Sequence, residues 1–300
     1  MGKKVLITGG TGLVGQQLIP LLQKTGYEVA VLSRSANAES SVNTYVWDVE
    51  KEYIDPLAFE QTEVIIHLAG AGVADKRWSA ERKDLIYNSR VKSSLLLYNY
   101  LKSHEHQVKT FVGASAIGLY GADTGEAIIR EEAPIGTDFL AHVVDAWEGA
   151  TNKIASLGIR LIQPRIGIVL SGEGGALKEL LKPPVAAPLG NGQQYMSWIH
   201  IEDLCRMIQY GIEEEKIEGP FNAVGPEPKT NKDFTKIAAQ VMGKPYLPIP
   251  VPQLVLKLML GEMAQIVLGG SRISAEKIRK AGFRFEFPRL EEALTDLKES

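Results

Sequence analysis

The most informative segment of the chain is Val5-Leu6-Ile7-Thr8-Gly9-Gly10-Thr11-Gly12-Leu13-Val14-Gly15, an apolar run followed by a glycine-rich turn and the start of a helical pattern. In such a segment Gly9 permits a tight turn, Gly12 lets the backbone approach a pyrophosphate, and Gly15 allows close packing of helix and strand. Unpaired N–H groups at the helix start attract phosphate oxygens. The segment therefore predicts a dinucleotide-binding unit; the alternative is a turn that only redirects the chain.

The residues that end the next apolar run indicate which dinucleotide is bound. Ser33 and Arg34 follow residues 29–32, and no Asp or Glu is present there. An acid at this position would pair with a free ribose 2′-hydroxyl. A guanidinium beside a hydroxyl instead suits a 2′-phosphate, because Arg forms charge-assisted bonds to phosphate. We therefore predict NADP over NAD; the alternative is that Arg34 is only a solvated residue at a strand end.

Short apolar runs alternate with longer segments of helical period through the first two thirds of the chain. The runs typical of buried strands are residues 5–7, 29–32, 64–68, 110–114 and 159–162, and the segments typical of helices are residues 13–25 and 82–103. Gly26 would close the first of these helices. Alternating strands and helices indicate βαβ units. The pattern predicts an α/β fold with a doubly wound parallel sheet of the Rossmann type.

Glycine and proline become frequent after residue 170, which indicates short elements and loops. Helical patterns at residues 253–268 and 290–298 predict a smaller, mainly helical C-terminal lobe. We assign residues 1–170 and about 194–225 to an NADP-binding domain, and residues 171–193 and 226–300 to a substrate lobe with a C-terminal extension.

Composition and charge exclude several classes of protein. The 300 residues are 45% hydrophobic and 23% charged, which is ordinary for a globular chain and unlike a coiled coil or a disordered protein. Lys and Arg total 33 against 36 Asp and Glu, a net charge of −3, and no basic block is present. We therefore expect neither a nucleic acid nor an anionic membrane surface as partner.

Cysteine and histidine usage gives no sign of a disulfide or a metal site. Cys205 is the single cysteine, and no histidine cluster at zinc-ligand spacing accompanies it. The N-terminal sequence lacks the apolar core of a secretory signal. The apolar stretch 254–270 is interrupted by Lys257 and Glu262, which argues against a membrane span. We expect a cytoplasmic protein without a bound metal.

The chain resembles the extended short-chain dehydrogenases/reductases, the superfamily of nucleotide-sugar epimerases and dehydratases, over roughly residues 3–225. Asp48-Val49 resembles that family's adenine-contacting pair, and His67-Leu68-Ala69-Gly70 resembles its fourth-strand motif. Pro164-Arg165 resembles the segment that borders the nicotinamide. Together with the turn, the resemblance implies dinucleotide contacts at Gly9, Thr11, Gly12, Leu13, Val14, Gly15, Ser33, Arg34, Asp48, Val49, Leu68, Ala69, Gly70 and Arg165.

Further segments resemble the family's catalytic region. Asn88 falls where the family places a structural active-site asparagine, and Ser115 begins a segment that resembles the catalytic-serine strand. The segment Trp198-Ile199-His200-Ile201-Glu202-Asp203 resembles a signature before the substrate lobe. Within it we expect His200 and Asp203 to fix the start of a helix, with Asp203 as a local cap.

The C-terminal part narrows the resemblance. Pro248-Ile249-Pro250-Val251-Pro252, followed by Gly261-Glu262-Met263-Ala264, is similar to an extension of unknown role in an atypical group of epimerase-family proteins. That label names a fold relationship rather than a reaction. By analogy with the fold alone, residues 172–177 and 193–198 would border a small-molecule substrate, and a homodimer is one assembly open to such a chain.

The chain departs from the family at its proton-transfer pair. Family chemistry needs Tyr-x-x-x-Lys on the helix after the serine strand, where the lysine lowers the phenol pKa from about 10. Counting back from Glu148, which resembles a glutamate of that helix, puts Leu140 and Val144 at the two positions. Neither side chain can carry a proton. The nearest polar candidates are His142 and Asp145. Tyr120 lies near Ser115, but without a neighbouring lysine it is a poor base.

Two functions of different classes are open at this point. The first is an NADP(H)-binding oxidoreductase or epimerase that acts on a small polar carbonyl or hydroxyl compound. In it Ser115 would hydrogen-bond to the substrate oxygen, and Tyr120 or His142 would carry the proton. The second is a catalytically silent NADP(H)-binding sensor or scaffold, which Leu140 and Val144 favour. A partner protein that binds no nucleotide is a weaker third alternative, because the glycine turn is intact.

Overall fold

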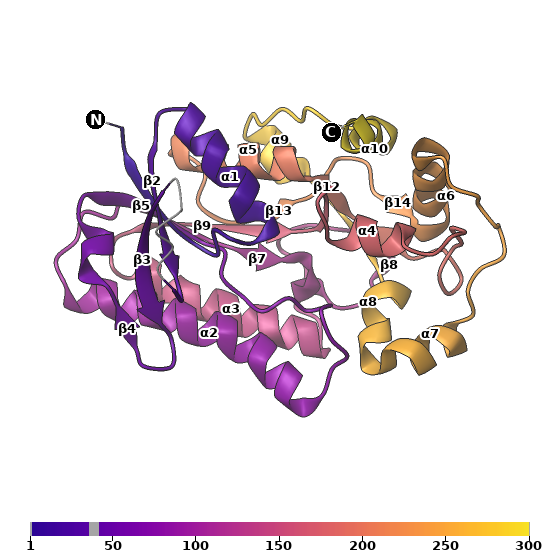
Figure 1. Cartoon of the computed structure of the whole chain (residues 1–300), viewed down its shortest axis with the longest axis horizontal. Coiled ribbons are helices and arrows are strands. Elements are labelled where there is room, and N and C mark those ends of the chain that lie inside the picture. Colours follow the sequence, from indigo (N-terminus) through magenta and orange to yellow (C-terminus); the bar gives the residue numbers. More distant parts are fainter. Residues whose placement is uncertain (1, 36–41, 300) are drawn as a thin grey trace.

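The computed structural model describes residues 2–35 and 42–299, and its centre is a mostly parallel β-sheet with helices on both faces (Figure 1). The strands of this sheet are β1 (Lys4–Thr8), β2 (Glu28–Ser33), β3 (Asn43–Asp48), β4 (Tyr53–Ile54), β5 (Thr62–His67), β6 (Thr110–Gly113), β7 (Ser115–Ala116), β9 (Arg160–Ile166) and β13 (Gly219–Ala223). Their spatial order is β13-β9-β6-β5-β1-β2-β3-β4, with β7 beside β9, and the pair β3–β4 is antiparallel. Because the strand order reverses beside β1, a ligand crevice is expected there. The predicted doubly wound sheet is confirmed.

Helices cover both faces of the sheet because its strands are apolar on both sides. The flanking helices are α1 (Leu13–Lys24), α2 (Ala80–Ser103), α3 (Phe139–Ala155) and α5 (Ile201–Glu213). In Figure 1, α1 and α5 lie on one face, and α2 and α3 lie on the other. Successive side chains of β1 alternate between the two cores: Val5 and Ile7 pack with Leu18, whereas Leu6 packs with Leu97.

The chain beyond β9 forms mostly short elements, as its glycine and proline content predicts. They are β10 (Ile168–Leu170), α4 (Ala176–Leu181), β11 (Tyr195–Met196), β12 (Trp198–His200), β14 (Lys229–Thr230), α6 (Asn231–Met242), α7 (Gln253–Leu260), η3 (Gly261–Ala264), α8 (Gln265–Leu268), β15 (Ser271–Ile273), α9 (Glu276–Lys280) and α10 (Leu290–Glu299). Earlier in the chain, η1 (Pro56–Phe59), η2 (Ile117–Tyr120) and β8 (Gly125–Ile129) complete the elements. β10 pairs with β12, β11 with β14, and β15 with β8. The C-terminal region is mainly helical, as predicted, while the domain boundaries stay predictions.

The ends of the first two helices follow from local capping. α1 ends at Lys24, one residue before the predicted end, and Gly26 at φ +92° turns the chain after it. α2 begins at Ala80, ahead of the predicted start, because the Ser79 hydroxyl oxygen accepts the Arg82 N–H. Both helices are therefore confirmed with small shifts at their ends.

The single helix predicted over residues 253–268 is wrong. Gly261 has φ +62°, a left-handed conformation that ends α7 and separates it from η3 and α8. The hydrophobic pattern continues across this break, which is why the sequence suggests one helix. No helix in the described ranges is long and apolar enough to cross a membrane.

The start of α5 is fixed by His200, as predicted, but Asp203 has another role. His200 Nδ1 accepts the Glu202 N–H at 3.2 Å. Asp203 is fully buried, and its carboxylate accepts the N–H groups of Glu286 and Phe287, each at 2.9 Å. The predicted local cap at Asp203 is wrong, because its carboxylate instead anchors a distant C-terminal segment to α5.

Candidate functional site

The glycine turn adopts a conformation that larger residues cannot take. Gly9 has φ +74°, and a Cβ atom on it would lie 2.9 Å from the Ala69 backbone nitrogen. A Cβ atom on Gly15 would lie 2.5 Å from the Gly9 carbonyl oxygen, so α1 approaches the turn itself rather than only the strand. A Cβ atom on Gly12 would meet only that same oxygen, at 3.2 Å. The turn is therefore compact beneath Gly9 and Gly15 and open at the exposed Gly12.

The first turn of α1 is open to an anion. Gly12 occupies the N-cap position without a side-chain hydrogen bond, and the first turn carries no acidic residue. The N–H groups there have no partner within the helix, and the helix dipole adds partial positive charge. Leu13 and Val14 are half-buried beside the exposed Thr11. A Cβ atom on Gly175 would lie 3.2 Å from Leu13 Cδ2, which places this part of the predicted cleft beside the turn. These residues fit a pyrophosphate.

The other predicted dinucleotide contacts lie at the same edge of the sheet. β1, β2, β3 and β5 are parallel neighbours, so residues at their carboxyl ends meet there. These residues are Ser33 and Arg34 at β2, Asp48 and Val49 at β3, and Leu68, Ala69 and Gly70 at β5. Arg34 is exposed, and its guanidinium has no ion-pair partner within residues 2–35 and 42–299. It is available to an anionic group.

Asp48 is fixed within a turn of its own. Its carboxylate accepts the N–H groups of Glu50 and Lys51, each at 3.1 Å, and it pairs with the Lys51 ammonium at 3.1 Å. The hydrogen bond from the Lys51 side chain is the largest cause that holds the pKa of the Asp48 carboxyl below its usual value. The carboxylate is therefore ionised and held at the end of β3, beside the half-buried Val49.

His67 joins the end of β5 to neighbouring elements and is fully buried. Its Nδ1 lies 2.7 Å from Thr8 Oγ1, and its Nε2 lies 3.1 Å from the hydroxyl oxygens of Ser93 and Ser94. Thr8 Oγ1 also accepts the Ala69 N–H at 3.2 Å. Burial lowers the pKa of His67 to about 3, so its imidazole is neutral at pH 7. This network positions the backbone that follows β5, a role that the motif in the sequence did not reveal.

Ser115, Glu148 and Arg165 form a buried cluster where β7 and β9 meet α3. The Ser115 hydroxyl donates to Glu148 Oε1 at 2.5 Å. Arg165 donates from Nε to Oε1 at 2.8 Å and from Nη2 to Oε2 at 3.0 Å, a two-pronged ion pair. Burial opposes the charge on Arg165, but the hydrogen bonds to Glu148 and Tyr120 outweigh it and raise the Arg165 pKa. The Arg165 guanidinium, which the sequence predicts to contact the dinucleotide, is thus ion-paired with Glu148 in the structure.

Tyr120 closes this cluster from η2. Its hydroxyl donates to Asn222 Oδ1 at 2.6 Å and accepts from Arg165 Nη1 at 2.8 Å. Tyr120 is 4% exposed, and burial raises the pKa of its phenol to about 12. The phenol therefore keeps its proton, which it donates in the hydrogen bond to Asn222, in keeping with the expectation that Tyr120 is a poor base. Asn222, which comes from β13, carries no signal in the sequence that links it to Tyr120.

The face of α3 that turns toward η2 is apolar at the two critical positions. A Cβ atom on Gly118 would lie 3.6 Å from Leu140 Cβ and 3.9 Å from Val144 Cγ2. Glu148 reaches Ser115 from this same face, since positions four apart on a helix are neighbours. Leu140 and Val144 therefore face the serine segment, where the Tyr and Lys of the family's pair are expected.

His142 and Asn88 lie outside the buried cluster. His142 is exposed, and its ring stacks on Tyr87 of α2 with 5.6 Å between ring centroids. Asn88 follows Tyr87 and is half-buried. In the described part of the chain, neither side chain hydrogen-bonds to Ser115 or Tyr120. The structure brings Ser115, Tyr120 and Arg165 together and leaves the predicted roles of His142 and Asn88 untested.

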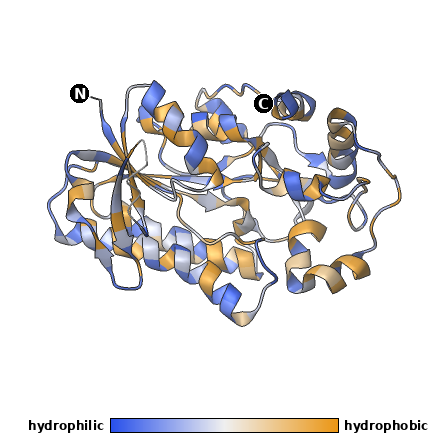
Figure 2. Ribbon diagram, viewed as in Figure 1, coloured by the Kyte–Doolittle hydropathy of each residue, from blue (hydrophilic) through white to orange (hydrophobic). Residues whose placement is uncertain are grey.

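Residues 253–268 pack against the start of α2. Lys83 of α2 forms an ion pair with Glu262 of η3. α2 begins at the carboxyl edge of the sheet, and Figure 1 shows α7 and α8 beside that end of α2. Figure 2 shows that α7 is mainly hydrophobic, and its Leu254 and Leu258 are 69% and 71% exposed. This segment therefore lies at the edge of the sheet that carries the candidate site.

Sequence comparisons identify the relatives of this chain. The NAD dependent epimerase/dehydratase family matches residues 5–140, and a Domain of unknown function (DUF1731) matches residues 251–297. The chain is 35% identical over 297 residues to epimerase family protein YfhF of Bacillus subtilis (strain 168), covering 98% of this chain and 97% of that protein. It is 36% identical over 298 residues to epimerase family protein SAR0825 of Staphylococcus aureus (strain MRSA252), covering 98% and 99%. The second match, to residues 251–297, falls in the C-terminal part whose sequence is similar to the extension of atypical epimerase-family proteins.

Solved structures share the whole fold. The human epimerase family protein SDR39U1 (isoform2), crystallised with NADPH, has a TM-score of 0.88 at 27% identity and covers 99% of both chains. The nucleoside-diphosphate sugar epimerase from Corynebacterium glutamicum has a TM-score of 0.79 at 30% identity, covering 100% of this chain and 59% of that one. The UDP-N-acetylglucosamine 4-epimerase from Bacillus cereus, at 17% identity and a TM-score of 0.78, shares the fold.

Proposed function

The chain belongs to the NAD-dependent epimerase/dehydratase family, and we propose on this premise that it is an NADP(H)-dependent oxidoreductase or epimerase acting on a small polar carbonyl or hydroxyl compound. The observation that carries the proposal is the open start of α1 at Gly12, with the exposed Arg34 at the end of the neighbouring strand, whose guanidinium pairs with no residue that the structure describes. The NADPH found with the human relative supports the phosphate-bearing form of the cofactor.

Different residues of the chain would bind different parts of such a cofactor. Backbone N–H groups at the start of α1 would hold the pyrophosphate. Arg34, beside the Ser33 hydroxyl, would hold the 2′-phosphate through charge-assisted bonds. Asp48 and Val49 would border the adenine. A bound nicotinamide would supply the hydride donor or acceptor.

The buried cluster would position the substrate rather than activate it strongly. We propose that Ser115 hydrogen-bonds to the substrate oxygen and that Tyr120 carries the proton. Each hydroxyl donates within the cluster, so a substrate would have to displace Glu148 or Asn222 as its acceptor. Leu140 would add an apolar wall that excludes water from the serine segment.

The cofactor proposal is tested by titrating the protein with NADPH and NADH and following nicotinamide fluorescence. We expect Arg34→Ala to weaken NADPH binding by about tenfold or more, because charge-assisted hydrogen bonds to the phosphate are lost. NADH binding should change little, since it lacks that phosphate. Lys24→Ala, which removes an exposed charge at the other end of α1, is the control. Equal weakening of both nucleotides, or no binding of either, would contradict the assignment.

A catalytically silent NADP(H)-binding sensor or scaffold is the second candidate. It is favoured by Leu140 and Val144 on the helix face where a proton carrier is expected. The two candidates are separated by following NADPH oxidation with a panel of small carbonyl compounds. An enzyme should show turnover that Ser115→Ala abolishes while NADPH binding persists. If the protein binds NADPH but no compound of the panel causes NADPH to be oxidised, the result supports the silent function.

A further inference from the structure

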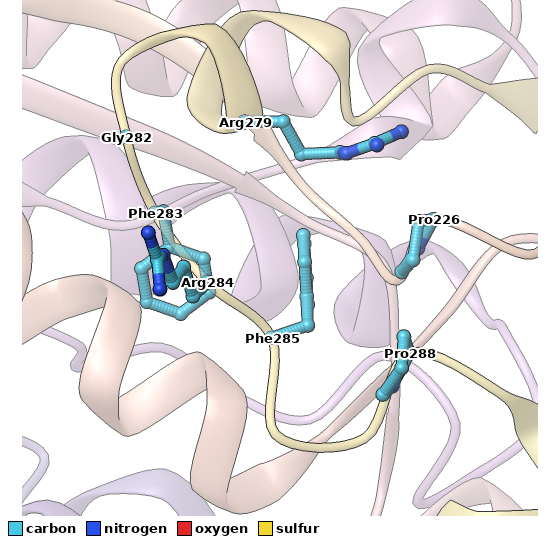
Figure 3. A pocket seen from close by; sticks show the side chains of 7 residues that line it. All are labelled: Pro226, Arg279, Gly282, Phe283, Arg284, Phe285 and Pro288. Carbon is cyan, nitrogen blue, oxygen red and sulfur yellow. The ribbon is translucent and has the colours of Figure 1, made fainter.

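A hollow of about 530 Å³ lies beside α9 and the loop that follows it. It is lined by Pro226, Arg279, Gly282, Phe283, Arg284, Phe285 and Pro288 (Figure 3). Figure 3 shows the Phe285 ring edge-on, with Pro226 and Pro288 on one side of it. Six of the seven lining residues fall within the domain of unknown function at residues 251–297. The volume lies within the range of about 300–1,000 Å³ for small-molecule sites.

The hollow combines apolar walls with unpaired positive charge. None of its seven lining residues is acidic, although the whole chain has a net charge of −3. Arg279 and Arg284 are exposed, and neither guanidinium has a hydrogen bond or ion pair with any described residue. The nearby Arg206, by contrast, is paired with Asp203 at 2.9 Å. Guanidinium groups beside an aromatic ring suit a carboxylate or phosphate attached to a flat body.

The backbone of the hollow is held in place by hydrogen bonds to side chains of α5. The carboxylate of Asp203 accepts the N–H groups of Glu286 and Phe287, each at 2.9 Å. The Tyr210 hydroxyl donates to the Ala281 carbonyl oxygen at 2.8 Å on the other side of the loop. The loop is thus fixed to α5 on both sides. A preformed wall of this kind lowers the entropic cost of binding a ligand.

We propose that this hollow is a binding site for a small organic anion with a planar ring, such as an aromatic carboxylate. The ligand ring would stack on Phe285, on the side that faces Pro226 and Pro288, and its anionic group would meet Arg279. Phe283 packs edge-to-face against Phe285, with ring centroids 5.1 Å apart, and so fixes the stacking surface. Inorganic phosphate lacks the ring and a neutral aromatic compound lacks the charge, so each satisfies only half of the site.

This site is distinct from the proposed cofactor site. Pro226 follows β13, and in the sheet β13 is separated from β1 by β9, β6 and β5. The glycine turn follows β1. The proposal therefore does not depend on the proposed function, and a bound dinucleotide should leave the hollow open.

The test is isothermal titration calorimetry with 2-naphthoate, performed with and without a saturating concentration of NADPH. We expect a dissociation constant below about 1 mM that NADPH does not change, and binding at least about tenfold weaker for 2-naphthamide and for inorganic phosphate. Arg279→Gln should weaken 2-naphthoate binding by about fivefold or more. Arg284→Gln should weaken it less, because Figure 3 shows Arg284 beside Phe283, on the other side of Phe285 from Pro226 and Pro288. Lys280→Gln removes a neighbouring exposed charge outside the hollow and should change the affinity less than about twofold.

A second variant tests the stacking surface independently of charge. Phe285→Leu keeps an apolar side chain but removes the ring, and it should weaken 2-naphthoate binding severalfold while the circular dichroism spectrum stays unchanged. Three results would overturn the proposal: no 2-naphthoate binding to the native protein, equal affinity in Arg279→Gln and Lys280→Gln, or displacement of 2-naphthoate by NADPH. The last would place the ligand in the dinucleotide site.

Discussion

Among single residues, Glu148 has the clearest consequence for stability, because it neutralises the buried guanidinium of Arg165. Removing one partner of a buried ion pair leaves the other charge uncompensated and costs about 3–5 kcal/mol. We expect Glu148→Gln to lower the free energy of unfolding by about this amount in urea denaturation at pH 7. Gln is nearly the same size as Glu, so the loss reports charge rather than volume.

The control for Glu148 is an ion pair at the surface. Glu276 pairs with Arg130 at 3.0 Å, and both side chains are exposed. Exposed pairs contribute at most about 1 kcal/mol, so Glu276→Gln should have a small effect. Adding Arg165→Met to Glu148→Gln should recover part of the lost stability, because the unpaired charge is removed. Equal losses for the two single variants would show that the buried charge does not carry this energy.

At the scale of single elements, Gly15 determines whether α1 can approach the turn before it. A Cβ atom there would lie 2.5 Å from the Gly9 oxygen and 2.6 Å from Gly10 Cα, both backbone atoms that cannot rotate away. We expect Gly15→Ala to destabilise the protein by about 1–3 kcal/mol and to weaken NADPH binding, because the turn must shift. Denaturant unfolding and NADPH titration measure the two effects.

The matched substitution lies in another helix that flanks the sheet. Gly149 is exposed in α3, and nothing lies within 4 Å of a Cβ atom added to it. Gly149→Ala should stabilise the protein by about 0.4–1 kcal/mol, since alanine reduces the entropy of the unfolded chain. If both alanine variants changed stability in the same direction, the close contact at Gly15 would not be the cause of its effect.

Elements with a strong local pattern were predictable from the sequence, and contacts between distant elements were not. The strand–turn–helix around residues 5–15 is encoded by adjacent residues, so its type was predicted correctly and its ends to within one residue. The break at Gly261 was missed because the apolar pattern runs through it, and only the left-handed backbone ends α7. The anchoring by Asp203 joins positions 83 and 84 residues apart, a separation at which no helical or strand period gives a signal.

At the scale of the whole molecule, the C-terminal residues serve two separate parts of the surface. Glu262 binds Lys83 at the edge of the sheet that carries the candidate site. The segment from Gly282 to Pro288 instead forms the wall of the hollow and is fixed to α5 by Asp203. The extension thus contacts the sheet domain at two separate places, at Glu262 and at the backbone of Glu286 and Phe287, while α7, which precedes both in the chain, exposes much apolar surface.

Acid stability of the whole molecule should depend on His67, which joins β1, β5 and α2. In the unfolded chain His67 binds a proton near its ordinary pKa of about 6.5, whereas in the folded chain its pKa is about 3. The stability that the neutral imidazole contributes is therefore complete above about pH 6.5 and is lost as the pH falls toward 3, by about 1.4 kcal/mol per pH unit.

Urea denaturation at about pH 7.5, 6.5 and 5.5 measures this dependence. His67→Gln should lower stability at every pH but flatten its decline below about pH 6.5, because one proton is no longer taken up on unfolding. Part of the decline should persist, since burial also lowers the pKa of His200. His104→Gln, at an exposed position, is the matched substitution and should leave the decline unchanged. A His67→Gln protein with the full native decline would mean that His67 takes up a proton in the folded state as readily as in the unfolded one.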